Sequence, residues 1–228
     1  MNAEGPEPEH LCHTPVMLDA VLAHLLPKPG MRCVDMTVGL GGHAAAMLER
    51  IAPDGRLLGI DRDSAALEHA RERLRVFGER CTLVQGNFSS VASLAHEHGF
   101  DNANTVLCDL GVSSLQLDDA ARGFSWREDA PLDMRMGDDA ECTAADIINT
   151  YDEDELTTVL REYGGERCAH GIAREICRRR REKRIATTRE LASLVSAVYA
   201  RRGWRHSKVH PATRAFQERV AIRDWRPN

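Results

Sequence analysis

The sequence predicts an α/β protein built on a doubly wound parallel sheet, followed by a helical region. Three observations indicate this class. Short apolar runs alternate with helix-patterned segments over the first 110 residues. A glycine-rich turn at residues 39–43 joins the first apolar run to a helix. Strand signals stop after about residue 112, and capped helical segments take their place.

In the first half we expect strands and helices in strict alternation. Residues 64–77 are predicted to turn Ala65, Ala66, Ala70 and Leu74 inward. The expected strands are residues 31–36, 56–60, 81–85 and 104–110, and the expected helices are residues 16–26, 44–51, 64–77 and 91–98.

The second half reads as helices with recognisable starts. Thr143 with Asp146 and Thr187 with Glu190 have the spacing of capping boxes. Residues 152–163 and 166–184 are expected to be helical, the latter with Ile172, Ile176 and Cys177 as an apolar stripe. We therefore predict a core at residues 1–112, a helical insert at 113–215, and at 216–228 the start of a helix returning to the core.

Charge is divided unevenly along the chain. Residues 1–160 hold 12 Lys and Arg against 28 Asp and Glu, a net −16, whereas residues 161–228 hold 18 against 7, a net +11. A basic excess over so long a stretch suits contact with a polyanion, although a solvated basic helix face would have the same composition.

The cysteine pattern and the hydropathy indicate the cellular compartment of the protein. The seven cysteines include no Cys-x-x-Cys pair, and no Cys/His cluster appears, so we expect neither disulfides nor a metal site. No run of about 18 apolar residues exists, and residues 1–10 carry no Lys or Arg. These features predict a cytoplasmic protein with no membrane partner.

The glycine turn and two nearby acids indicate a nucleotide-containing cofactor. Gly39, Gly41 and Gly42 follow a strand and open a helix, and Asp61 lies at the next strand end, where an acid takes the ribose hydroxyls. Asp35 beside the turn would repel a pyrophosphate but suits a ligand with a positive end. This favours S-adenosylmethionine over NAD, and an NAD-linked oxidoreductase remains the alternative.

Three more residues are candidates at the same strand ends. His43 could donate a hydrogen bond to the cofactor carboxylate. Phe88 either packs an adenine face or plugs the core. Asp109 either accepts a proton from an exocyclic amine, whose conjugated lone pair makes it a poor nucleophile, or contacts the cofactor.

These residues lie in motifs that together resemble the bacterial MraW/RsmH methyltransferases from about residue 11 to 217. The motifs are His13-Thr-Pro-Val-Met-Leu18, Asp35-Met-Thr-Val-Gly-Leu-Gly-Gly-His43, Gly59-Ile-Asp-Arg-Asp63, Asp109-Leu-Gly-Val-Ser-Ser-Leu-Gln-Leu-Asp118, Arg122-Gly-Phe-Ser-Trp126, Pro131-Leu-Asp-Met-Arg-Met136 and His210-Pro-Ala-Thr-Arg-Ala-Phe-Gln217.

The resemblance implies a Rossmann-like methyltransferase sheet and a specific reaction. That reaction is S-adenosylmethionine-dependent methylation of the N(4) amine of a cytosine in the decoding centre of 16S ribosomal RNA, in the cytoplasm. It further implies that the helical insert helps to hold RNA. The cofactor contacts that it implies are Gly41, Gly42, His43, Asp61, Phe88, Asp109 and Gln116.

The sequence departs from the family pattern in two places. Gly165 replaces the first of two acids that usually follow Tyr-Gly, and the chain is short at its C-terminal end, without the last strands of the family sheet. We therefore expect the strand near residues 104–110 to be an exposed edge. A non-catalytic RNA-binding fragment is the alternative function, and whether the chain forms a homodimer stays open.

Overall fold

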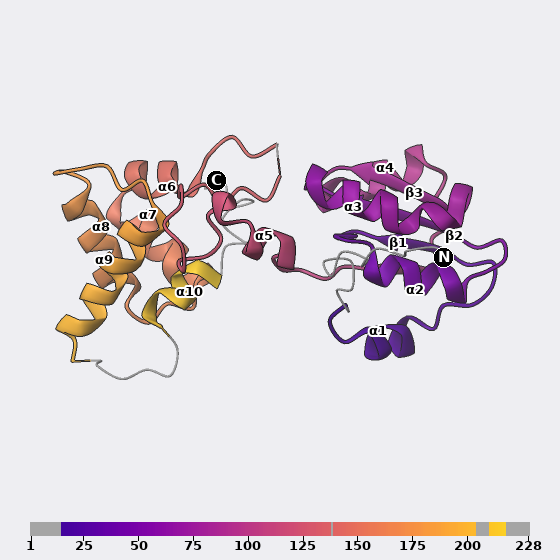
Figure 1. The fold of residues 1–228 in the computed structure, drawn as a ribbon, viewed down its shortest axis with the longest axis horizontal. Coiled ribbons are helices and arrows are strands. Elements are labelled where there is room, and N and C mark those ends of the chain that lie inside the picture. Colours follow the sequence, from indigo (N-terminus) through magenta and orange to yellow (C-terminus); the bar gives the residue numbers. More distant parts are fainter. Residues whose placement is uncertain (1–14, 138, 204–209, 218–228) are drawn as a thin grey trace, which may run out of the picture. The chain divides into compact units, whose positions relative to one another are not determined.

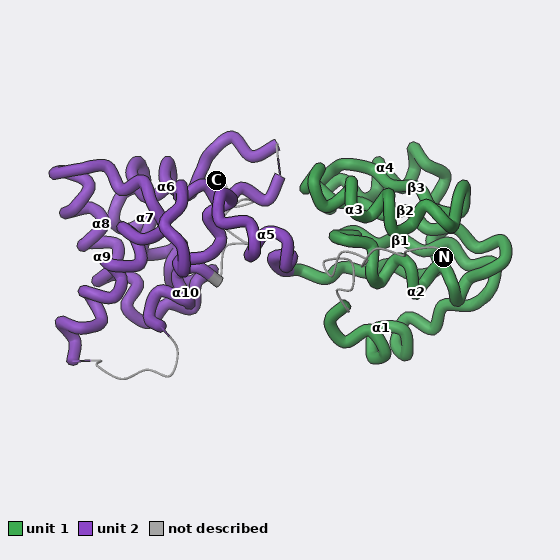
Figure 2. The backbone as a smooth tube through the Cα atoms, in the orientation of Figure 1, with its two compact units in different colours: residues 1–110 green, residues 111–228 purple. Residues whose placement is uncertain are grey.

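The computed structural model describes residues 15–137, 139–203 and 210–217, and it divides the chain into two compact units (Figure 2). The first unit comprises residues 1–110 and the second residues 111–228. This division lies two residues before the predicted boundary at 112. Of the predicted returning segment, 216–228, only residues 216 and 217 lie within the described part.

The first unit contains a four-stranded parallel sheet in the order β3-β2-β1-β4. Its central register places Val34 of β1 between Leu58 of β2 and Val106 of β4. Parallel neighbours joined by helices confirm the doubly wound, Rossmann-like α/β fold. The strands are β1 (Arg32–Asp35), β2 (Arg56–Asp61), β3 (Cys81–Gln85) and β4 (Thr105–Leu107).

Helices cover both faces of this sheet (Figure 1). The first three pack on the face that carries Cys33 and Leu57, and the fourth packs with Phe100 on the face that carries Val34 and Leu58. The helices are α1 (Leu18–Leu25), α2 (Gly42–Arg50), α3 (Ser64–Leu74) and α4 (Val91–Glu97), with short 3₁₀ turns at Arg75–Arg80 and Phe88–Ser90.

Two details of the first unit correct the sequence predictions. Ala65 is exposed, and Leu67 takes its place among the inward residues, because at 3.6 residues per turn Leu67 lies on the same face of α3 as Ala66, Ala70 and Leu74. Strand β4 has three residues rather than seven, since only these pair with β1. In the described sheet β4 is an edge strand, as predicted, and Val106 on it is 50% exposed.

The second unit is helical. Both predicted capping boxes are confirmed: the Thr143 and Thr187 hydroxyls accept the N–H groups of Asp146 and Glu190. Among the described residues of this unit, the β-type pairing is a single antiparallel bridge between Pro131 and Thr187. The helices are α5 (Ser114–Asp118), α6 (Ala144–Thr150), α7 (Glu153–Thr158), α8 (Ala169–Arg179), α9 (Thr188–Arg201) and α10 (Pro211–Gln217), with a 3₁₀ turn at Ala120–Arg122 and a π-helical turn at Val159–Tyr163.

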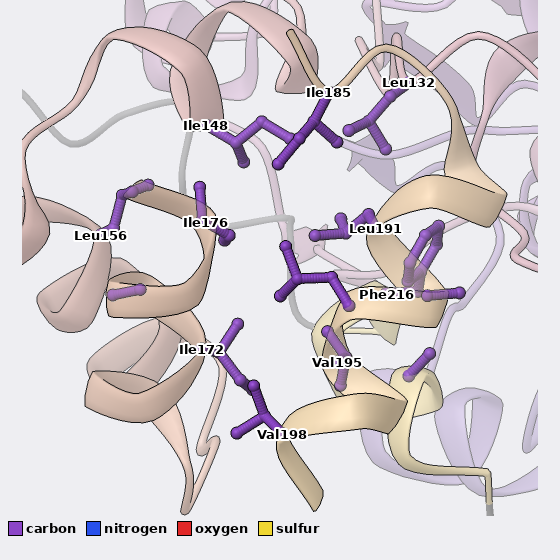
Figure 3. Close-up of a cluster of buried hydrophobic side chains, with 14 of the residues drawn as sticks. Leu132, Ile148, Leu156, Ile172, Ile176, Ile185, Leu191, Val195, Val198 and Phe216 are labelled. Atoms are coloured by element: carbon purple, nitrogen blue, oxygen red, sulfur yellow. The ribbon is translucent and has the colours of Figure 1, made fainter. Parts of the chain in front are cut away.

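A separate hydrophobic core holds these helices together (Figure 3). Ile172 and Ile176 of α8 face the side chains of α9, including Val195. Phe216 of α10 is buried in the same cluster. The predicted stripe is thus confirmed for the two isoleucines, while Cys177 is only partly buried at its rim. Helix α8 is shorter than predicted, because it ends at Arg179 and gives way to a turn.

No helix within the described ranges is long and apolar enough to cross a membrane.

Candidate cofactor and catalytic site

The carboxyl ends of the strands in the first unit are tied together by hydrogen bonds. The Gly39 N–H after β1 donates to Asp61 Oδ2 at the end of β2, at 2.8 Å. The Asp109 N–H after β4 donates to Thr37 Oγ1 after β1, also at 2.8 Å. The glycine turn, Asp61 and Asp109 are therefore neighbours at the carboxyl ends of the strands, where open α/β sheets bind their ligands.

The glycine turn has the backbone conformation that its residues predict. Gly39 and Gly41 have φ values of 52° and 78°, in the left-handed region that favours glycine. At Gly42 a Cβ would lie 2.4 Å from Pro15 Cγ, so only glycine fits beneath that proline. Helix α2 starts here with no side-chain cap, which leaves N–H groups of its first turn for an anionic group such as a cofactor carboxylate.

Asp61 is held with both carboxylate oxygens near backbone donors. Oδ2 accepts from Gly39, and Oδ1 accepts from the Asp63 N–H at 3.0 Å. Burial nevertheless raises the pKa of Asp61 above its ordinary value. Each oxygen keeps a second lone pair, so the carboxylate can also accept from a ribose hydroxyl.

Asp35 is the most deeply buried acid at these strand ends, at 1% exposure. Its Oδ1 accepts from the Thr37 N–H at 3.1 Å, whereas Oδ2 is buried with no hydrogen-bond partner among the described residues. Burial, together with the nearby charges of Asp61 and Asp109, raises the pKa of Asp35 to about 7, although the hydrogen bond from the Thr37 N–H lowers it. A buried carboxylate lacking a donor fits a ligand with a cationic end.

Two further predicted ligands lie at the same edge. His43 is buried in the first turn of α2, and its Nε2 donates to the Val16 carbonyl at 3.1 Å. In the neutral ring this leaves Nδ1 as an acceptor, not as a donor to a cofactor carboxylate. Phe88 follows β3, is half-buried, and lies outside the three hydrophobic clusters of the described residues. This position favours the interpretation that the Phe88 ring packs against an adenine over the interpretation that it fills the hydrophobic core.

Asp109 and Gln116 fall on different units. The Asp109 side chain is exposed and forms no hydrogen bond or ion pair within the described ranges. Gln116 belongs to α5, is buried, and uses Oε1 to accept the Ser113 N–H at 3.0 Å in a capping box. Its role as a cofactor contact remains a prediction.

Two residues that the sequence interpretation did not single out hold the site in place. Thr37 links the turn after β1 to Asp109, and the buried Asp63 caps α3 while its N–H supports Asp61. An acid directly before a helix-patterned segment is a known cap signal and could have identified Asp63. Nothing in the local sequence marks Thr37, because its partner lies 72 residues away.

Within the described ranges no group of three or more His, Cys, Asp and Glu side chains is placed to hold a metal ion.

The sheet, its glycine turn and the acids at the strand ends define a Rossmann-like fold with a cofactor site at the carboxyl ends of its strands. Residues 10–224 match the family model described as the MraW methylase family. The chain therefore belongs to the MraW methylase family, and its cofactor is S-adenosyl-L-methionine.

Curated relatives agree with this assignment. The chain is 48% identical over 213 residues to "Ribosomal RNA small subunit methyltransferase H" of Geobacter sulfurreducens, covering 93% of this chain and 68% of the relative. It is 49% identical over 228 residues to the protein of the same name from Thermobifida fusca, covering 95% of this chain and 68% of that one. The chain thus spans about two thirds of the length of these relatives.

A solved structure titled as a putative rRNA methylase from Clostridium thermocellum is 22% identical and aligns with 33% of this chain and 43% of its own, with a TM-score of 0.32. This similarity is too limited to add to the family assignment.

Proposed function

We propose that this chain transfers a methyl group to the exocyclic N(4) amine of a cytosine in the decoding centre of small-subunit 16S ribosomal RNA, in the cytoplasm. The names of its relatives support small-subunit ribosomal RNA as the substrate. The cytosine amine is supported by the motif resemblance and by the placement of Asp109. The observation that carries the proposal is an exposed carboxylate fixed by its backbone beside the glycine turn.

The bound cofactor supplies a methyl group activated by the positive sulfonium. The residues around the turn then have separate tasks. Asp61 would accept hydrogen bonds from the ribose hydroxyls. Asp35 would offer to the cationic end its Oδ2, which has no hydrogen-bond partner among the described residues. The first turn of α2 offers backbone N–H groups to the cofactor carboxylate.

Asp109 acts on the substrate amine. A cytosine amine is a weak nucleophile because its lone pair is conjugated with the ring. An N–H hydrogen bond to the Asp109 carboxylate lets the nitrogen rehybridise and aligns it for attack on the methyl carbon. The cofactor would supply the methyl carbon, and its sulfur would keep the electron pair of the C–S bond. The amine proton would pass to the Asp109 carboxylate or to water beyond it. The base must leave its stack for this reaction, which a single-stranded or flipped cytosine allows.

The experiment is a methyl-transfer assay with labelled S-adenosylmethionine on small subunits from cells lacking the modification, with nucleoside mass spectrometry of the product. We expect N(4)-methylcytidine, and a rate for Asp109→Asn that is lower by about 100-fold or more. Asp54→Asn is the matched control, because Asp54 precedes β2 and so lies at the amino ends of the strands, at the opposite end from Asp61 and Asp109.

Other outcomes redirect the proposal. Methylation at a different atom of cytosine would contradict the amine chemistry. Cofactor binding without any methyl transfer would favour the alternative of a non-catalytic RNA-binding protein. Loss of cofactor binding in Asp109→Asn would make Asp109 a cofactor ligand rather than the residue that orients the amine.

A further inference from the structure

Two arginines from neighbouring helices share one buried carboxylate in the second unit. Glu175 of α8 has a side chain only 9% exposed, and it pairs with Arg178 of α8 at 2.7 Å and with Arg201 of α9 at 2.9 Å. Both guanidinium groups remain largely exposed, at 51% and 62%. Glu175 therefore fixes two exposed guanidinium groups side by side, since their acceptor oxygens are the same two atoms.

Two more arginines extend this surface. The Arg202 guanidinium reaches from the end of α9 to Cys168 Sγ at 3.6 Å and lies close to Gly171, where a Cβ would be 3.3 Å from its Nη2. Arg174 lies between Gly171 and Arg178 at helical spacings of three and four, so it shares their face of α8. It is exposed and has no ion-pair partner within the described ranges. We call Arg174, Arg178, Arg201 and Arg202 the four-arginine patch.

The acids near the four-arginine patch do not neutralise it. Glu175 balances one of the four charges, and Glu182 adds an exposed ion pair to Arg178 at 3.1 Å. From α7, which packs against α8, Glu153 lies 3.7 Å from His170 instead. The patch therefore retains about two uncompensated positive charges in a small area. These positive charges repel one another, and a bound anion would offset that repulsion.

We propose that the four-arginine patch binds the phosphodiester backbone of the RNA substrate. This inference rests on the proposed function and adds to it the surface that holds the RNA. Guanidinium groups present several N–H donors in one plane, which matches the oxygens of a phosphate better than an ammonium group does. Because Glu175 already orders two of them, less side-chain freedom is lost when a phosphate binds.

The test measures binding of a fluorescently labelled RNA fragment of the small-subunit decoding region to the 228-residue chain, without cofactor, over a range of salt concentrations. The variant is Arg174→Ala combined with Arg202→Ala, which leaves both ion pairs of Glu175 in place. We expect at least a 10-fold weaker affinity near 0.1 M salt. The slope of log K against log salt should fall by roughly 1.5, as expected for two lost phosphate contacts.

Two controls separate the patch from general charge and from folding. Arg71→Ala removes one exposed, ion-paired arginine from the first unit and should change the affinity by less than about twofold. Arg174→Lys combined with Arg202→Lys keeps the charge, so it should restore the salt slope while recovering only part of the affinity. Calorimetry with S-adenosylmethionine should give wild-type affinity for the double alanine variant.

Several results would overturn the inference. Equal RNA affinity of the double alanine variant and the wild type would do so, as would a wild-type chain that does not bind the RNA. Unchanged RNA binding with lost binding to anionic phospholipid vesicles would assign the patch to a membrane surface. The proposed function fails separately, because it depends on the methyl-transfer assay and not on this affinity.

Discussion

The backbone N–H of Gly39 donates to the Asp61 carboxylate at 2.8 Å, which joins the turn after β1 to the end of β2. This bond orients the acid beside the glycine turn before any ligand binds. Asp61→Ala should therefore weaken S-adenosylmethionine binding by at least 10-fold, because a hydrogen bond to a charged group contributes about 1.5–3 kcal/mol. Isothermal titration calorimetry measures this affinity directly.

Asp61→Asn separates two roles of this side chain: accepting backbone N–H groups and accepting the ribose hydroxyls of the cofactor. Its amide keeps one acceptor oxygen for a backbone N–H but loses the charge that favours the ribose hydroxyls. An intermediate affinity is expected. Wild-type affinity in Asp61→Ala would remove Asp61 from the cofactor site.

Cofactor affinity should depend on pH through Asp35. Burial raises the pKa of this carboxyl to about 7, and a cationic ligand binds its ionised form. Affinity should therefore increase by about 10-fold between pH 6 and pH 8, as ionisation of Asp35 nears completion. Calorimetry at several pH values, in buffers of different ionisation enthalpy, should also detect proton release on binding near pH 7.

Asp35→Asn is the control for this pH dependence. It should give a weaker affinity that no longer varies across this range. In the ligand-free protein the raised pKa means that stability falls as pH rises from about 4 to about 7, because the folded state holds the proton more tightly. That decrease should also be smaller in Asp35→Asn. A pH dependence that persists in the variant would assign it to another group.

Glu175 should stabilise the second unit. Hydrogen bonds from Arg178 and then Arg201 lower its pKa to about 2. Because the folded pKa is below the ordinary value, this stabilisation is present above about pH 4.5 and is lost as pH falls through about 2. Glu175→Gln should lower the free energy of unfolding by about 1–3 kcal/mol at pH 7, and by less at pH 3.

Urea unfolding at both pH values measures this difference. Glu182→Gln is the matched control, because Glu182 is 66% exposed and Arg178 is its ion-pair partner among the described residues. It should change stability by less than about 0.5 kcal/mol. Equal effects of the two substitutions would mean that burial of the Glu175 carboxylate contributes nothing.

The edge strand β4 should promote self-association. Within the described sheet it pairs with β1 alone, and Val106 on it is 50% exposed. A charged residue at an edge opposes pairing with another chain. Val106→Lys should therefore reduce concentration-dependent association, as measured by sedimentation velocity.

Val76→Lys provides the comparison for that result. Val76 is 82% exposed, but it lies in the 3₁₀ turn after α3 rather than in a strand. It should have little effect on association. A similar decrease for both substitutions would attribute the change to net charge and not to the strand edge.

The alternation of strands and helices was predictable from the sequence, as were the glycine turn and both capping boxes. These features depend on residues within one or two turns of each other, so local spacing is enough to indicate them. The strand-end acids could also be located, because the carboxyl ends of parallel strands share one edge of the sheet. Helix ends and strand lengths were less accurate: α8 ends earlier than expected, and β4 is shorter.

By itself, the sequence determined the α/β class, the residues of the glycine turn and the basic character of the second half. Only the tertiary structure decided which side chains pair across long separations. It joins Thr37 to Asp109, His43 to Val16 and Glu175 to Arg201. It also leaves one oxygen of Asp35 buried without a donor from the part of the chain that the structure describes. The physical reason is that burial and long-range hydrogen bonds depend on how separate segments pack, which local periodicity does not specify.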